Sequence, residues 1–111
     1  MTVTAKVLIP SKIVASSQTT QYTASGVTAI IDKLTATNYS ASSATISVNL
    51  VTAFDTAGNQ NLITKTKTLQ PAESYTFPEV VGHVLMSGDS ISTIASSATT
   101  INIRSSGREV S

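Results

Sequence analysis

The feature that most constrains the fold is an alternation of side chains with a period of two. In residues 44–54, every second side chain from Ile46 to Phe54 falls on one face, and the intervening side chains fall on the other. Successive side chains of a β-strand point to opposite faces, so this pattern predicts a half-buried strand. Residues 62–69 alternate again, and the Gly and Asn between the two runs favour a turn. We therefore predict a β-hairpin over residues 44–69.

Shorter runs rich in β-branched residues extend this pattern along the chain. They predict strands at residues 2–9, 19–25, 28–38, 74–77, 90–96 and 101–105. Residues 79–86 fit either one helical turn or a buried extended segment, and residues 106–111 are expected to form a tail. About eight short strands indicate a single all-β domain over residues 1–111. We expect an antiparallel β-sandwich, immunoglobulin-like or jelly-roll-like, with little helix, and a small barrel as the alternative.

The composition places hydroxyl groups where most proteins carry charges. Only 12% of the residues are charged, whereas the chain has 18 Thr and 17 Ser, and its formal net charge is +1. Hydroxyls are cheaper to desolvate than ions, so a neighbouring subunit covers such a surface at little penalty. Neither nucleic acid nor a membrane is an expected partner, since no basic stripe and no long apolar run is present. The absence of cysteine excludes disulfides and thiolate metal sites, and the start lacks the apolar stretch of a signal peptide.

The stretch FPEVVGHVLMSGDSISTIASS, residues 77–97, contains the residue types of a hydrolytic site. A small hydrolase would use His83, the only histidine, to activate Ser90, and Asp89 and Glu79 are the nearby acids that could orient the imidazole. A simpler interpretation is a turn in which Gly88 takes a positive φ, Asp89 bonds a nearby backbone N–H and Ser90 begins a strand. We favour the turn and expect His83 to be a structural residue. The sequence predicts no enzymatic activity, no cofactor and no metal site.

The other charged residues give no metal site and leave two interpretations for one pair of lysines. Asp32, Asp55 and Asp89 are too scattered to form a calcium loop. Lys65 and Lys67 predict either an edge strand whose charges discourage pairing with strands of other molecules, which we favour, or a contact with an acidic partner.

Three segments carry a likeness to known proteins. They are NYSASSATISVNLV, then NLITKTKTLQPAESYTFPEVVGHVLMSGDSISTIAS with its P-E-x-x-G-H-x-L-x-x-G-D-x-I-S pattern, and SSATTINIRSSGREV. Together, residues 38–111 resemble a group of small virion proteins of tailed bacteriophages. The resemblance implies a β-sandwich incorporated into the particle, as a capsid decoration protein, a neck component or a fibre-associated protein.

The leading hypothesis is a capsid decoration or cement protein that spans joints between major capsid subunits. We expect a homo-oligomer, with a trimer favoured because capsids offer threefold sites, assembled in the host bacterial cytoplasm and located in the virion. The N-terminal strand, residues 1–10, is the candidate for pairing with another chain, with Val3, Val7 and Ile9 on one side as the intersubunit contact. The alternatives are a neck, tail or fibre-associated structural protein, or a β-sandwich that binds a receptor or glycan.

Overall fold

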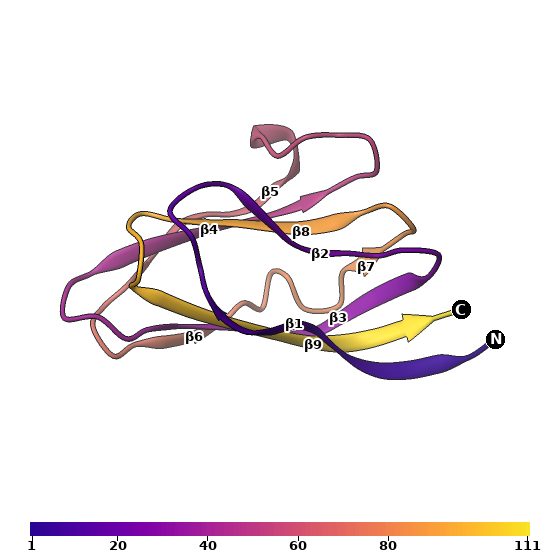
Figure 1. Ribbon diagram of the computed structural model, residues 1–111, viewed down its shortest axis with the longest axis horizontal. Coiled ribbons are helices and arrows are strands. Elements are labelled where there is room, and N and C mark those ends of the chain that lie inside the picture. Colours follow the sequence, from indigo (N-terminus) through magenta and orange to yellow (C-terminus); the bar gives the residue numbers. More distant parts are fainter.

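The computed structural model describes residues 1–111 and shows nine strands and one short 3-10 helix (Figure 1). The elements are β1 (Val3–Ile13), β2 (Thr19–Thr23), β3 (Thr28–Asn38), β4 (Ala44–Val51), η1 (Asn59–Asn61), β5 (Leu62–Leu69), β6 (Ser74–Thr76), β7 (Val84–Leu85), β8 (Ser90–Ala95) and β9 (Ile101–Val110). Most strands follow the alternating runs, because β-branched residues crowd χ1 in a helix and fit a pleated sheet. The all-β class with little helix is therefore confirmed.

The strands form two antiparallel sheets that lie face to face (Figure 1). Sheet A has the order β1-β9-β3-β6, with β7 also pairing with β3, and sheet B has the order β2-β8-β4-β5. The pairing is nested about the β4–β5 hairpin, since β3 pairs with β6 and β7, β2 with β8, and β1 with β9. Successive pairs alternate between the sheets, as in a jelly roll and unlike the strand order of an immunoglobulin domain.

Aliphatic side chains from both sheets meet between them and form one core. Ile31 and Leu34 come from sheet A, Ile46 and Ile91 come from sheet B, and all four are fully buried. Burial of each such side chain contributes about 1.5–3 kcal/mol. Phe77, just after β6, is the largest buried side chain. Branched aliphatics dominate because only 5% of the residues are aromatic.

The predicted hairpin is confirmed, although its first strand is shorter than the alternation suggests. β4 and β5 pair antiparallel, but β4 ends at Val51. Beyond that residue the chain forms a loop over residues 52–58, which stands clear of sheet B (Figure 1). Phe54 therefore does not face the core. Its side chain is fully exposed and its φ is 68°.

The expected tail at residues 106–111 belongs to a strand, so that prediction is wrong. β9 continues to Val110 and lies between β1 and β3, which both pair with it. Its neighbours supply the hydrogen bonds and packing that the local sequence alone does not indicate. The backbone N–H groups of Thr2 and Ser111 each donate to the other's carbonyl at 2.9 Å, so the two chain ends are joined (Figure 1).

Residues 79–86 form a turn followed by a short strand. The backbone N–H groups of Val80 and Val81 donate to the carbonyl of Phe77 at 3.2 and 3.3 Å. Gly82 then adopts a φ of 88°, which ends the turn because other residues rarely take this conformation. β7 follows and pairs with β3 at the edge of sheet A.

Candidate functional site

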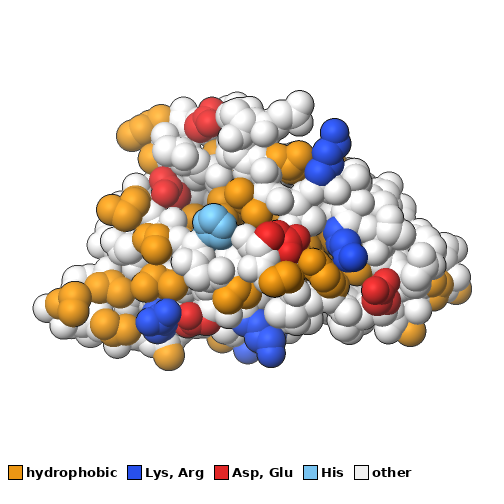
Figure 2. All heavy atoms as spheres, turned by 180° about the vertical axis from the view of Figure 1, so that it is seen from behind, with side chains coloured by type: hydrophobic (Ala, Val, Ile, Leu, Met, Phe, Trp, Pro, Cys, Tyr) orange, Lys and Arg blue, Asp and Glu red, His pale blue; other side chains and the backbone are white.

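The residue types of a hydrolytic site do not come together. His83 is exposed in the segment just before β7, at the edge of sheet A, whereas Ser90 begins β8 in sheet B. A histidine base must lie within hydrogen-bond reach of the serine it activates. Figure 2 shows the imidazole at the surface with hydrophobic side chains around it. His83 is therefore exposed, and the expectation that it has a structural role stays a prediction.

Asp89 instead stabilises a turn, as the simpler interpretation predicted. Gly88 has a φ of 96°, and the Asp89 carboxylate accepts hydrogen bonds from the backbone N–H groups of Met86 and Ala53, both at 2.9 Å. A Cβ atom at position 88 would lie 2.8 Å from the Cβ atom of Ala53. The turn therefore holds the β4–β5 loop, and both carboxylate oxygens are occupied by backbone groups.

Glu79 connects the two sheets at the side of the molecule where β5 and β6 are the edge strands. Its carboxylate accepts a hydrogen bond from the Thr64 hydroxyl of β5 at 2.5 Å and from the Tyr75 hydroxyl of β6 at 3.1 Å. Lys67 lies above the Tyr75 ring, with its Nζ atom 4.5 Å from the centroid. Desolvation raises the pKa of Glu79, but the two hydroxyls, a backbone N–H and Lys67 together lower it below the ordinary value.

The two lysines of β5 lie on an edge strand of sheet B. Lys65 is exposed and Lys67 is half-buried against Tyr75. β5 has a bulge between them, where Thr66 has a φ of 45° and its N–H donates to the Ser47 hydroxyl at 2.8 Å. This position fits the favoured interpretation of a charged edge that discourages strand pairing.

The N-terminal strand β1 is the edge of sheet A, and its only strand partner is β9. Val3 and Val7 are 55% and 39% exposed, but Ile9 is fully buried in the core. The expectation that Ile9 shares their side is therefore wrong. One extra residue is inserted between Val7 and Ile9 relative to β9, and Leu8 and Ile9 both turn inward at this bulge.

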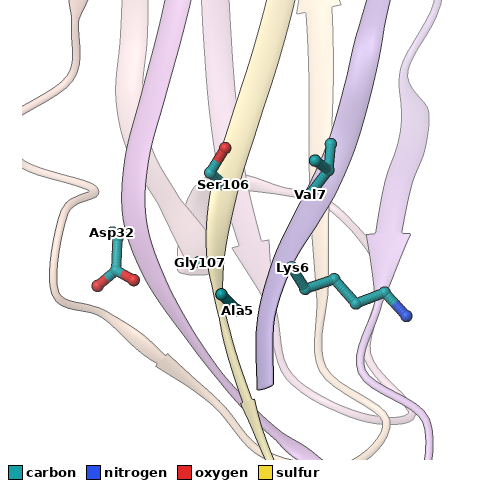
Figure 3. A pocket seen from close by; sticks show the side chains of 6 residues that line it. All are labelled: Ala5, Lys6, Val7, Asp32, Ser106 and Gly107. Carbon is teal, nitrogen blue, oxygen red and sulfur yellow. The ribbon is translucent and has the colours of Figure 1, made fainter. Parts of the chain in front are cut away.

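The outward side of β1 forms part of a shallow depression of about 390 Å³. Ala5 and Val7 line it together with Ser106 and Gly107 of β9 and Asp32 of β3 (Figure 3). We call Val3, Ala5 and Val7 the β1 face. The figure shows Lys6 extending away from Asp32, and Asp32 is instead paired with Arg108 at 2.9 Å.

Lys6 belongs to a polar link between the sheets that the sequence did not reveal. Its Nζ atom lies 3.4 Å from the Glu109 carboxylate, which accepts a hydrogen bond of 2.5 Å from the Tyr22 hydroxyl of β2. Desolvation, with the Glu109 hydrogen bond and charge, raises the pKa of Tyr22. The Tyr22 and Lys6 hydrogen bonds lower the pKa of Glu109 despite its partial desolvation. Tyr22 and Glu109 are 87 positions apart, so no local pattern joins them.

The outer edge of β1 has no strand partner within the chain, although β1 is 11 residues long. Backbone N–H and C=O groups on such an edge are able to pair with a strand of another molecule. The β1 face lies beside this edge and adds apolar area to any such contact. Backbone pairing and apolar contact, rather than proton transfer, are therefore the chemistry that this region offers.

Comparison with known proteins leaves the family open. No protein-family model matches the chain, and no curated protein or solved structure matches it. The resemblance to tailed-phage virion proteins therefore stays a prediction. None of the helical structure is long and apolar enough to cross a bilayer.

Proposed function

We propose that this protein is a structural component of a tailed-phage virion that works by assembling, most simply as a capsid decoration or cement protein. The open edge of β1, with the exposed β1 face beside it, is the observation that supports assembly most directly. A homo-oligomer, with a trimer favoured, would contact the major capsid protein across joints between its subunits. The proposal assigns no catalytic residue.

The low charge of the surface supports the same proposal on energetic grounds. A buried ion that loses its partner costs several kcal/mol, whereas a buried hydroxyl needs only one hydrogen bond. With 12% charged residues, the chain is able to cover broad areas without leaving many ions unpaired. Contact area repeated over many copies would then resist pressure from within the head.

The double variant Val3→Lys/Val7→Lys tests assembly. Both side chains are exposed, so the melting temperature should stay close to that of the wild type while light scattering shows a shift from oligomer to monomer. Val84→Lys, at an exposed position on the opposite edge of sheet A, is the matched control and should leave the oligomer intact. Deleting residues 1–10 is a poor test because it also removes the core residues Leu8 and Ile9.

Two results would contradict the proposal. One is a wild-type protein that stays monomeric at every concentration and does not bind purified particles. The other is mass spectrometry of the parent particle that fails to detect the chain. A copy number suited to a single ring would instead indicate a position in the neck or tail, which is the alternative structural role.

A further inference from the structure

A second cleft lies on the far side of the molecule, over the outer surface of sheet B. Its volume is about 260 Å³, and it separates the 52–58 loop from the start of β2. Figure 1 shows this loop projecting beyond sheet B on the same side as the segment that enters β2. The residues that matter for its chemistry are Gln18, Thr20, Val51, Asp55, Thr56 and Ser90.

Three residues that line this cleft carry hydroxyls that have no hydrogen-bond partner within the chain. They are Thr20 of β2, Thr56 of the loop and Ser90 of β8, whereas the neighbouring Gln18 amide N–H is held by the Ser92 hydroxyl at 2.7 Å. A hydroxyl both donates and accepts hydrogen bonds, so three of them around one space match a ligand that carries several hydroxyls. Val51 contributes an apolar surface between them.

The loop is fixed in place, so little order has to be gained when a ligand binds. Asn49 of β4 donates from Nδ2 to the Gly58 carbonyl at 3.0 Å and to Asn61 Oδ1 at 2.8 Å. Asn61 and Gln60 both donate to the Thr56 carbonyl at 2.9 Å. A cleft held in one conformation binds without a large entropic penalty.

The charge of the cleft selects among hydroxylated ligands. The pKa of Asp55 is lowered, chiefly by the hydrogen bond from the Thr56 backbone N–H and also by those from the Gln60 and Asn61 amides, despite some desolvation. This carboxylate is therefore ionised at neutral pH. No lysine or arginine lines the cleft. An acidic ligand would meet only negative charge there. The neighbouring Phe54 ring is fully exposed and presents an apolar surface beside Asp55.

We propose that this cleft binds one residue of a neutral saccharide through the Thr20, Thr56 and Ser90 hydroxyls and the Asp55 carboxylate. The volume is below the range of about 300–1,000 Å³ typical of sites for drug-sized ligands, which limits the occupant to about one sugar ring. The inference goes beyond the assembly role and is independent of it.

The test is an NMR titration of the wild-type protein with free neutral hexoses and N-acetylhexosamines, alongside an array of neutral and acidic glycans. Saturable shifts should appear at the amides of Thr20, Thr56 and Ser90. The double variant Thr20→Val/Ser90→Ala removes two hydroxyls and should weaken binding at least about tenfold. Array binding without free-sugar binding would show that the ligand is the end of a longer glycan.

Thr68→Val is the matched control, since Thr68 is an exposed strand residue of sheet B outside the cleft. It should bind as the wild type does, and every variant should keep the wild-type melting temperature and oligomer size. Absence of saturable shifts together with an empty array would overturn the inference. So would shifts that persist in the double variant, or binding restricted to acidic glycans.

Discussion

Gly107 lies where the backbones of β9 and β3 approach too closely for any side chain. A Cβ atom at this position would be 2.1 Å from the Ile30 carbonyl oxygen and 2.8 Å from a Leu8 methyl group. The backbone of a central strand cannot move aside without breaking pairs on both of its edges. Glycine is therefore required here because any side chain would overlap the neighbouring strand, not because of its φ angle.

We predict that Gly107→Ala lowers the free energy of unfolding by about 3 kcal/mol or more, because the new methyl group overlaps a main-chain oxygen. Urea unfolding followed by circular dichroism measures this. Gly26→Ala is the control, since Gly26 has a φ of 69° but no atom within 4 Å of the added Cβ. Its cost should be about 1 kcal/mol. Equal losses in the two variants would contradict the contact argument.

The bulge in β1 shows why residue-scale prediction failed at Ile9. Strict alternation places Val3, Val7 and Ile9 on one side, but one inserted residue reverses the facing of everything that follows it. The residues at the bulge, Val7, Leu8 and Ile9, are all apolar, so the sequence offers no contrast that marks it. Asp89 was predictable because Gly-Asp is a local turn signal.

At the scale of elements, alternation identified the strands but not their ends. The 44–69 hairpin and β3 were predictable from local pattern, since each has a long apolar face. The end of β9 was not, because SSGREV has little β propensity and is held by β1 and β3 on either side. Long-range pairing overrides weak propensity there.

We predict that removing residues 107–111 abolishes the cooperative thermal unfolding transition. The truncation breaks the pairs from Val3 to Lys6 on one side and from Thr28 to Ile31 on the other. Removing only Met1, which is fully exposed, should have no effect. Differential scanning calorimetry distinguishes the two. A truncated chain that melts within about 5 °C of the full chain would restore the interpretation of this segment as a tail.

At the scale of the whole molecule, the nested topology and the cleft were beyond sequence reasoning. Both sandwich types have similar strand lengths, and only pairing between distant segments separates a jelly roll from an immunoglobulin domain. Thr20, Thr56 and Ser90 are indistinguishable in the sequence from the many other Ser and Thr residues of the chain. Their convergence on one cleft is a product of the fold.

We predict that the protein loses stability in acid through carboxylates that tie the sheets together. The pKa values of Glu79 and Glu109 are lowered from 4.5 in the folded state. Their contribution is therefore fully present above the unfolded pKa of about 4.5 and is lost as the pH falls through the lower folded values. The melting temperature should therefore fall as the pH is lowered below about 4.5.

The double variant Glu79→Gln/Glu109→Gln isolates these two groups. It should start from a lower melting temperature at pH 7 and show a shallower decline in acid than the wild type. Glu73→Gln, a carboxylate for which the structure shows a contact only to the Gln70 backbone N–H, serves as the control. Parallel declines in the wild type and the double variant would place the acid sensitivity elsewhere.

The pairing of the first strand with the last has a mechanical consequence. Thr2 and Ser111 are bonded to each other where the antiparallel β1–β9 pair begins, and both ends leave the molecule at one place (Figure 1). Tension applied between the two ends would act along the hydrogen bonds between β1 and β9, and these bonds would break one after another from that end. A force applied along the strands would instead load many inter-strand hydrogen bonds at once. The force needed to unfold this protein therefore depends on the direction in which it is applied.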